Sequence, residues 1–352
     1  MAEHIPEDVL KKIFQRLPIK SLIRFSSLSK RWRFIILRDR QFATSQYQIA
    51  SGNNKSVCLH IGFKSDSFQS LNLQTTTSAL RNLRYPFRQP HVYLLSSCRG
   101  LVFASFKAWG LQAYMWNPST GFFKKLPHPD ADVMSSNITG FGYISATDDY
   151  KILMGSSKKF CISARYGEVQ KAKIWIFSSK SNSWKRIQDC QSPVCPKTTE
   201  GSLLNEAFHW LETSCVVAFD LADDKFRKVP LPVDFAADYF RRLGDFGGCL
   251  CVFGLADTTA GSLDLWVMRE YDVGNSWTKL FNIKYTNQPE RIYYVNPIFV
   301  METSTFLVIN SDSLTGVKLV RSYHNEDKIE DIHYNEDIFS MIGYEESLLW
   351  LE

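Results

Sequence analysis

The stretch IPEDVLKKIFQRLPIKSLIRFSSLSKRWRFII, residues 5–36, has a helical pattern, whereas the sequence after it is rich in strand-forming residues. Apolar residues recur at helical spacing from Val9 to Leu17, and Pro18 ends this first predicted helix. A second short helix is predicted from about Lys20, and Ser29 can cap a third. Three such short helices cannot bury all their apolar side chains, so the surplus predicts docking on another protein.

The positive charge of the chain is concentrated in this helical segment. The whole chain has a net charge of +5, but its first 40 residues hold ten Lys or Arg and four Asp or Glu. The first 40 residues therefore carry +6, and all the others together carry −1. A basic helical head indicates either an acidic protein surface or nucleic acid as its partner.

Composition and length limit the class of protein. The chain has 352 residues, of which 45% are hydrophobic and 14% aromatic, enough for a large core. No apolar run reaches the roughly 18 residues of a membrane span, and the acidic N-terminus does not resemble a signal peptide. We therefore expect a protein of the cytoplasm, the nucleus or both. The eight cysteines form no CxxC pair, so we expect reduced thiols, without a metal or other cofactor.

Residues 5–36 resemble the F-box. The residues that match the usual F-box pattern as they stand are Asp8, Arg16, Leu17, Pro18, Lys20, Ser21, Leu22, Arg24, Phe25, Lys30 and Trp32. Ile5, Phe14 and Leu28 replace other apolar residues of that pattern. The resemblance implies docking on a Skp-type adaptor and, through it, on a cullin ubiquitin ligase. The adaptor-binding residues that it implies are Ile5, Pro6, Val9, Leu10, Ile13, Phe14, Leu17, Pro18, Leu22, Phe25, Leu28 and Trp32.

Two other interpretations of the head are weaker. It could be a plain helical cap on a β domain, but such a cap would not need so many apolar side chains. It could be a DNA-binding helix-turn-helix, but a recognition helix needs polar side chains that read bases. The third predicted helix offers mostly apolar residues from Trp32 to Ile36.

A hairpin pattern recurs through the rest of the chain. A short apolar strand, a polar turn and a second strand opened by an aromatic or apolar residue occur six times, 42 to 61 residues apart. The six hairpins are predicted at 57–73, 114–129, 174–187, 216–232, 265–283 and 319–334. This period is typical of a kelch-like propeller. The remaining strand candidates would complete about six four-stranded blades, and residues 341–351 are expected to pair with 57–73 and close the ring.

The same region resembles the F-box-associated, kelch-like region of the large plant F-box family, which includes S-locus F-box and F-box/kelch-repeat proteins. The segments that carry this resemblance are 98–102, 116–121, 207–211, 265–271 and 276–280. The fold class implied is α+β multidomain, with a three-helix F-box at residues 1–44 and an all-β propeller of about six kelch-like blades at 45–352. A short linker is expected at about 44–55. The resemblance does not identify the substrate.

The sequence lacks the motifs of common enzyme classes. There is no GxSxG, HExxH, Walker A or GxGxxG pattern. The turn from Asp272 to Trp277 matches a sialidase Asp-box, but that turn is structural. His209 lies beside Trp210 in a predicted strand and is interpreted as a packed histidine. We therefore expect no catalytic residue. The resemblance to F-box proteins implies a non-catalytic receptor of a Skp–cullin–F-box (SCF) ubiquitin ligase.

Recognition of a protein substrate is expected on loops of the β region. Two loops place aromatic residues beside arginine, a combination frequent in binding hot spots. The candidate substrate-binding residues are Tyr239, Phe240, Arg241, Arg242, Arg291, Tyr293 and Tyr294. Their alternative role is packing at ordinary strand starts. The rival function for the whole chain is a non-ligase module that binds protein or nucleic acid through the basic head.

Overall fold

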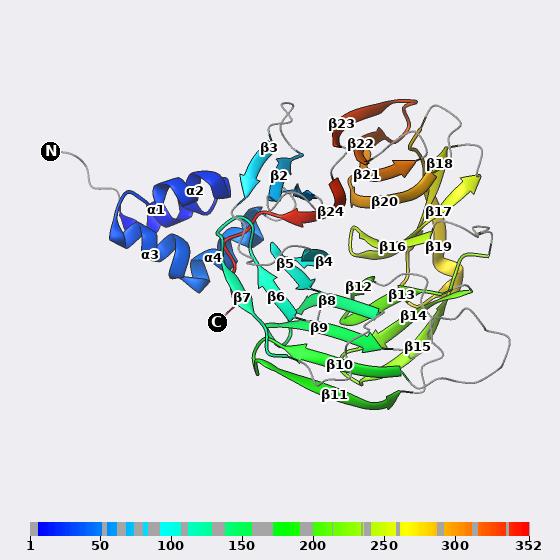
Figure 1. Ribbon diagram of the computed structural model, residues 1–352, viewed down its shortest axis with the longest axis horizontal. Coiled ribbons are helices and arrows are strands. Elements are labelled where there is room, and N and C mark those ends of the chain that lie inside the picture. Colours follow the sequence, from blue (N-terminus) through cyan, green and yellow to red (C-terminus); the bar gives the residue numbers. More distant parts are fainter. Residues whose placement is uncertain are drawn as a thin grey trace. The chain divides into compact units, whose positions relative to one another are not determined.

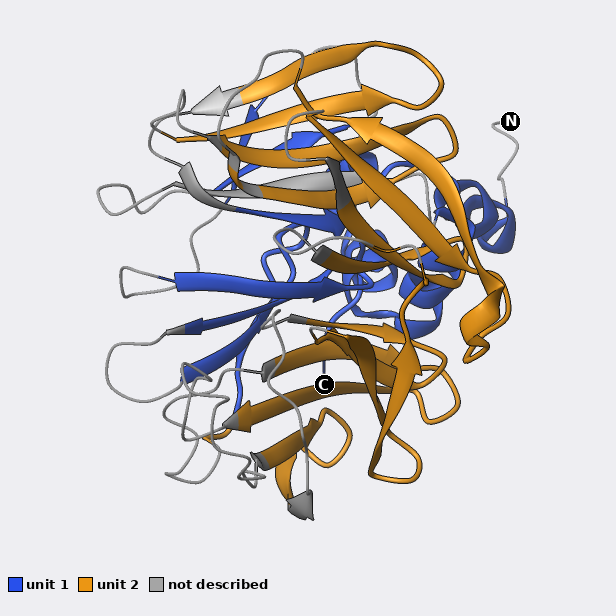
Figure 2. Ribbon diagram, turned by 90° about the vertical axis from the view of Figure 1, so that its right-hand side faces the viewer, with its two compact units in different colours: residues 1–107, 112–126, 340–352 blue, residues 108–111, 127–339 orange. Residues whose placement is uncertain are grey.

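The structure is a computed structural model of the whole chain, and it divides into two compact units (Figure 2). Unit 1 contains Met1–Lys107, Gln112–Leu126 and Ser340–Glu352, and unit 2 contains Ala108–Leu111 and Pro127–Phe339. The residues that the structure describes are 6–50, 55–61, 68–73, 80–83, 92–106, 112–128, 138–156, 172–190, 200–212, 214–233, 235, 241–257, 261–286, 292–311, 316–335 and 338–351.

Unit 1 begins with four helices, one more than predicted (Figure 1). Their bounds are α1 Glu7–Phe14, α2 Ile19–Phe25, α3 Lys30–Arg38 and α4 Arg40–Ala50. The first two begin directly after a proline, and the Ser29 hydroxyl caps α3 by accepting a hydrogen bond from the Trp32 amide at 3.1 Å. Asp39 accepts one from the Phe42 amide at 3.0 Å at the start of α4. Much of the expected linker at 44–55 is therefore helical.

Two four-stranded sheets complete unit 1. Their strands are β1 Lys55–Ile61, β2 Phe68–Asn72, β3 Leu80–Leu83, β4 Val92–Cys98, β5 Leu101–Phe106, β6 Gln112–Trp116, β7 Phe123–Lys125 and β24 Ile338–Glu345. The strand orders are β24-β1-β2-β3 and β4-β5-β6-β7. The predicted pairing of residues 341–351 with the first hairpin is confirmed up to Glu345, where β24 ends, and the strand does not continue to residue 351.

Since β24 takes the first place in its sheet, the first hairpin is shifted by one strand relative to the other five. The hairpin predicted at 57–73 supplies the second and third strands of its sheet, whereas the hairpin at 114–129 supplies the third and fourth. The sequence pattern predicts the same place in the sheet for both hairpins, so this difference was not expected. The shift follows from the closing strand, which is contributed by the other end of the chain.

Unit 2 contains sixteen described strands. Their bounds are β8 Ile138–Ile144, β9 Asp149–Ser156, β10 Ala172–Ser178, β11 Ser183–Cys190, β12 Glu200–Leu204, β13 Ala207–Leu211, β14 Cys215–Asp220, β15 Lys225–Pro230, β16 Arg241–Phe246, β17 Cys249–Asp257, β18 Ser262–Met268, β19 Trp277–Lys284, β20 Ile292–Val300, β21 Ser304–Ser311, β22 Val317–Tyr323 and β23 Ile329–Asn335. Consecutive strands form four antiparallel groups of four. Buried aliphatic and aromatic residues of neighbouring groups pack together as the core.

The first two groups of unit 2 are joined into one eight-stranded sheet by a short parallel pairing of β8 with β12. Gly201 lies opposite Gly140 in this pairing. A Cβ atom at Gly201 would lie 2.5 Å from the Trp210 ring, and one at Gly140 would lie 2.8 Å from the Phe208 ring. The Trp210 indole N–H donates to the Thr139 carbonyl at 3.1 Å. Glycine at 140 is therefore required for β8 to lie so close to Phe208 of the next group, and glycine at 201 leaves room for the Trp210 indole that bonds to Thr139 of β8.

Replacing Gly201 with alanine is expected to lower the free energy of unfolding by about 1–3 kcal/mol, because the added methyl group overlaps a fully buried indole. Urea denaturation measures the change. Gly244→Ala is the matched control, since its Cβ would come no nearer than 3.2 Å to the Cys251 sulfur. An equal loss of unfolding free energy in both variants would contradict a specific role for Gly201 where β8 pairs with β12.

Beyond β24, the chain leaves its sheet and enters the core of the helical head. Leu348 and Leu349 are buried among Ile19, Leu22 and Ile35 in unit 1. We call residues 346–351 the C-terminal segment. A strand was predicted over this segment, which is wrong: its apolar run fits a buried extended segment equally well.

Asn117, in the turn after β6, holds the C-terminal segment in place. Its side-chain amide donates to the Ser347 carbonyl at 3.0 Å and to the Leu349 carbonyl at 2.8 Å. Its side-chain oxygen accepts from the Ser119 amide at 2.8 Å, which shapes the turn. The Ser347 hydroxyl donates to the Arg99 carbonyl at 3.0 Å. This buried network connects the sheet, the C-terminal segment and the helices of unit 1.

No described helix is both long enough and apolar enough to span a membrane.

Candidate functional site

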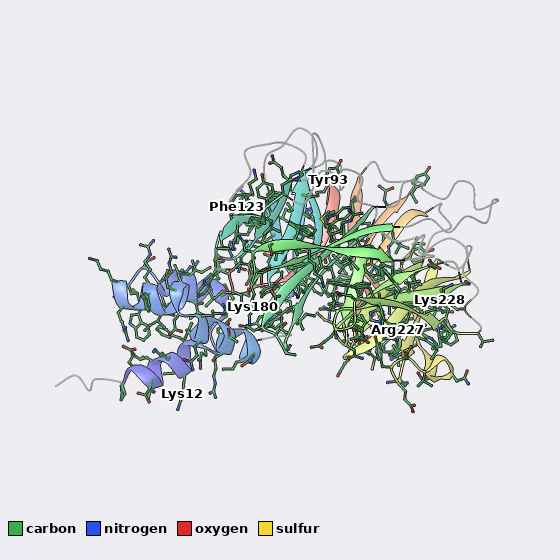
Figure 3. The ribbon with its side chains drawn as sticks, turned by 90° about the horizontal axis from the view of Figure 1, so that it is seen from below. Lys12, Tyr93, Phe123, Lys180, Arg227 and Lys228 are labelled. Carbon is green, nitrogen blue, oxygen red and sulfur yellow. The ribbon has the colours of Figure 1, made fainter. Side chains whose placement is uncertain are left out.

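The helical head exposes apolar side chains on α1 and on the turn after α2. No residue of α1 is buried, although its apolar residues recur at helical spacing. The exposed fraction is 40% for Val9, 47% for Ile13 and 68% for Leu28. Charged residues such as Lys12 occupy other positions of α1 (Figure 3). An exposed apolar surface of this kind on so short a helix is typical of a protein interface.

An aromatic cluster supports this surface. The Phe14 ring stacks on the Phe25 ring, with ring centroids 5.3 Å apart. The centroids of the Phe14 and Trp32 rings are 4.6 Å apart. Phe14, Phe25 and Trp32 are half-buried and pack against the core of the head, as Leu17 does. Each can therefore both stabilise the head and contact a partner.

The other residues predicted to bind an adaptor differ in their exposure. Pro6 and Pro18 are exposed, and Leu10 is half-buried. Leu22 has no exposed surface, so it can only support the surface from within. Ile5 lies outside the described residues.

An ion pair fixes α1 against α3. The Arg31 guanidinium donates to both carboxylate oxygens of Glu7, at 2.8 and 3.1 Å. Lys11 lies 3.3 Å from the same carboxylate, one helical turn away. The hydrogen bond from Arg31 lowers the pKa of Glu7. This two-point contact orients α1, so the apolar residues of α1 keep a defined direction.

The structure describes only part of the predicted substrate-binding set. Tyr239, Phe240 and Arg291 lie outside the described residues, and only the backbone of Arg241 and Tyr294 is described. Arg242, on β16, is half-buried opposite Phe253. Tyr293, on β20, is 55% exposed. Since β16 contacts β20 within unit 2, the structure places these two candidates on neighbouring strands.

Comparison with known proteins identifies both parts of the chain. Residues 3–43 match the F-box domain family, and residues 52–328 match the F-box associated beta propeller domain family. The chain belongs to the F-box-associated β-propeller family.

Several Arabidopsis thaliana proteins are similar to this chain. F-box protein CPR1 is 27% identical over 90% of this chain and 81% of its own length. F-box protein At3g07870 is 27% identical over 80% of this chain and 73% of its own length. F-box/kelch-repeat protein At3g23880 is 25% identical over 90% of this chain and 87% of its own length. The predicted family and fold class are thereby confirmed, with four helices in the N-terminal region.

Within this F-box-associated domain, the turn that resembles an Asp-box has a structural role. It forms a short 3-10 helix, Gly274–Ser276, and a Cβ atom at Gly274 would lie 2.4 Å from the Pro230 ring. The buried Trp277 donates its indole N–H to the Pro230 carbonyl at 2.8 Å. Trp184 makes the same contact with the Pro127 carbonyl, also at 2.8 Å. The turn therefore holds neighbouring blades of unit 2 together.

His209 is fully buried and belongs to a chain of hydrogen bonds. Its Nε2 lies 2.8 Å from the Tyr271 hydroxyl, and its Nδ1 lies 3.3 Å from the Ser202 carbonyl. Arg227, on β15 (Figure 3), donates to the same hydroxyl. Burial lowers the pKa of His209 to about 4, so the imidazole is neutral at pH 7. Nδ1 then donates to the Ser202 carbonyl, and Nε2 accepts from Tyr271. The packed histidine that we predicted is consistent with this geometry.

The low pKa of His209 predicts a pH dependence of stability. Above the unfolded pKa of about 6.5, the histidine is neutral in both states and stability is unaffected. As the pH falls from about 6.5 to about 4, the unfolded chain binds a proton that the folded chain excludes. The resulting loss, on the order of 3 kcal/mol at its maximum, levels off below the folded pKa. Urea denaturation across this range should show it, and His209→Gln, which cannot titrate, should reduce the slope. An unchanged slope in His209→Gln would assign the pH dependence to other groups.

Two groups around the helical head that can take part in binding were not predicted from the sequence. The C-terminal segment contributes Trp350 to the packing around the head. Phe34, on α3, is 55% exposed. The only sequence signal for the first is the apolar run SLLWL at 347–351, which is also typical of a strand.

Proposed function

We propose that this chain is the substrate-recognition subunit of an SCF E3 ubiquitin ligase. Residues 1–44 would bind a Skp-type adaptor and, through it, a cullin scaffold. Residues 45–352 would recruit the protein substrate. The observation that supports the proposal most strongly is α1, a helix with an exposed apolar surface and no buried residue, within a segment that matches the F-box domain family. F-box domains generally bind Skp-type adaptors.

The adaptor-binding surface in this proposal centres on Val9, Ile13 and Leu28, which are the exposed large hydrophobic residues of the predicted set. The aromatic cluster around Phe14 forms its edge. Docking would remove this apolar surface from water, and burial of apolar area is the main favourable term in protein association.

The proposed role in ubiquitin transfer is non-catalytic. A receptor of this kind holds the substrate near a ubiquitin-loaded partner and so raises the effective concentration of substrate lysines. Such a receptor would act in the cytoplasm, the nucleus or both. On this proposal the chain needs no metal or other cofactor.

Reconstitution tests the proposal. The full chain is mixed with a plant Skp-type adaptor and cullin, and complex formation is measured by size-exclusion chromatography at two salt concentrations. Apolar docking should survive moderate salt, whereas binding of nucleic acid by the basic head should weaken steeply. Absence of a complex with a folded chain, together with salt-sensitive binding to nucleic acid, would favour the rival function.

The proposed substrate-binding surface includes the candidates of β16 and β20. Once a substrate is known, replacement of Arg242 and Tyr293 by alanine is expected to weaken its capture at least tenfold, because arginine and tyrosine are frequent hot-spot residues. Adaptor binding should not change, since both residues lie in unit 2. Unchanged capture by the folded double variant would exclude these two residues from the site.

A further inference from the structure

Unit 1 contains a cavity of about 640 Å³ that no predicted residue set anticipated. Its walls are one face of α3, the turn between β6 and β7, and the C-terminal segment. The volume falls in the range of ordinary binding pockets, roughly 300–1,000 Å³. We call it the basic pocket.

The basic pocket combines cationic and apolar walls. The cations are Lys30, Arg33 and Arg38, all on α3 and all exposed. The apolar walls include Phe34 and Leu37 from α3, Phe122 from the β6–β7 turn, and Trp350 from the C-terminal segment. Large apolar side chains beside unburied cations fit a ligand that carries both an apolar group and negative charge.

The face of α3 that lines the pocket differs from the face that meets α1. The pocket-lining residues recur at positions 30, 33, 34, 37 and 38, which form one helical stripe. Arg31 and Trp32 instead contact Glu7 and Phe14 of α1. The pocket therefore lies on a different side of α3 from the proposed adaptor-binding surface of α1.

The charges of the pocket are not neutralised within the described part of the chain. No described carboxylate forms an ion pair with Lys30, Arg33 or Arg38, whereas the neighbouring Arg31 is paired with Glu7. Three unpaired cations around one cavity attract an anionic partner. Two of them are arginines, whose planar guanidinium groups can bind a carboxylate at two points.

We propose that the basic pocket binds a short acidic peptide segment of a second protein, with one bulky apolar side chain inserted against Phe34, Phe122 and Trp350. Its carboxylates pair with Arg33, Arg38 and Lys30. The apolar walls distinguish this ligand from duplex nucleic acid, whose bases are stacked inside the helix and whose phosphates would leave these walls unused. The exposed α3 wall suits a chain that crosses the pocket better than a small molecule, which is usually buried on most of its surface.

Fluorescence anisotropy with a labelled peptide tests the proposal on the full chain. The probe is an eight-residue peptide of glutamate and aspartate with a central tryptophan, and the control peptide has serine in place of tryptophan. We expect saturable binding of the probe, at least tenfold tighter than that of the control peptide. Equal binding of both peptides, or no saturable binding of the probe, would overturn the proposal.

Matched charge reversals locate the site. Arg33→Glu/Arg38→Glu is expected to weaken probe binding at least tenfold. Arg16→Glu/Arg24→Glu changes the head by the same charge at exposed positions outside the pocket, and it should change binding less than about threefold. Equal losses would show only general attraction to the basic head and would contradict the proposal. Phe34→Ser should remove the preference for tryptophan over serine.

The same measurement on the preassembled adaptor complex separates this proposal from the proposed function. Retained probe binding in the complex is the expected result. Loss of probe binding there would assign the pocket to the adaptor interface and overturn the idea of a second partner. Failure of the adaptor to bind, with probe binding intact, would contradict the ligase function but not the pocket.

Discussion

Replacing Val9 and Ile13 with aspartate is expected to abolish binding of a Skp-type adaptor. Both side chains are exposed on α1, so docking would bury two carboxylates against apolar surface. Burial of an unpaired charge costs several kcal/mol, and a loss of about 4 kcal/mol weakens binding by roughly a thousandfold. Co-purification and calorimetric titration with the adaptor measure the effect.

Two features make this double variant informative. Neither residue belongs to the buried core of the head, so the fold should remain intact and the thermal unfolding midpoint should change little. The matched control is Ile49→Asp on α4, because Ile49 is 49% exposed but lies outside the predicted surface. The control should bind the adaptor as the wild type does. Wild-type affinity of Val9→Asp/Ile13→Asp would place the adaptor elsewhere or remove it as a partner.

Replacing Asn117 with alanine is expected to lower the stability of unit 1 by on the order of 3 kcal/mol. The side chain has no exposed surface, and its loss leaves the carbonyls of Ser347 and Leu349 without their amide donor. A buried polar group left without its partner costs about 1–3 kcal/mol. The turn amide of Ser119 also loses its acceptor. Urea denaturation gives the change in the free energy of unfolding.

Hydrogen exchange locates the effect of Asn117→Ala. The C-terminal segment and the helices α2 to α4, which share its core, should lose protection, whereas the sheets of unit 2 should not. The control is Asn282→Ala in unit 2, where an exposed side-chain amide donates to Asp264 at 2.8 Å. Asn282→Ala should lower the free energy of unfolding by less than about 1 kcal/mol, since water can replace the lost hydrogen-bond partner. Equal costs in the two variants would refute the anchoring role of Asn117.

Much of the local structure could be predicted because its signals lie within short windows of sequence. Pro18 separates the first two helices, and Ser29 caps the third, as predicted. The six hairpins recur with a polar turn between apolar strands, and each is present. The fourth helix was missed because RQFATSQYQIA, residues 40–50, has only a weak apolar period.

The candidate site was only partly predictable. Leu22 and Ile13 both occupy apolar helical positions, yet Leu22 is 0% exposed and Ile13 is 47% exposed. Periodicity places both on an apolar face, but it does not show which part of that face the rest of the chain covers. The covering groups include Leu348 and Leu349, more than 300 residues away in the sequence.

The sequence by itself determined the helical head, the repeated hairpins and the family, because these depend on residue types at fixed short spacings. Only the tertiary structure decided that Asn117 anchors the C-terminal segment, that Gly201 and Gly140 join two blades, and that α3 presents its basic stripe to a cavity. Each of these depends on contacts between segments far apart in the chain. Such contacts are set by which surfaces become covered when the elements pack, and no local pattern records that outcome.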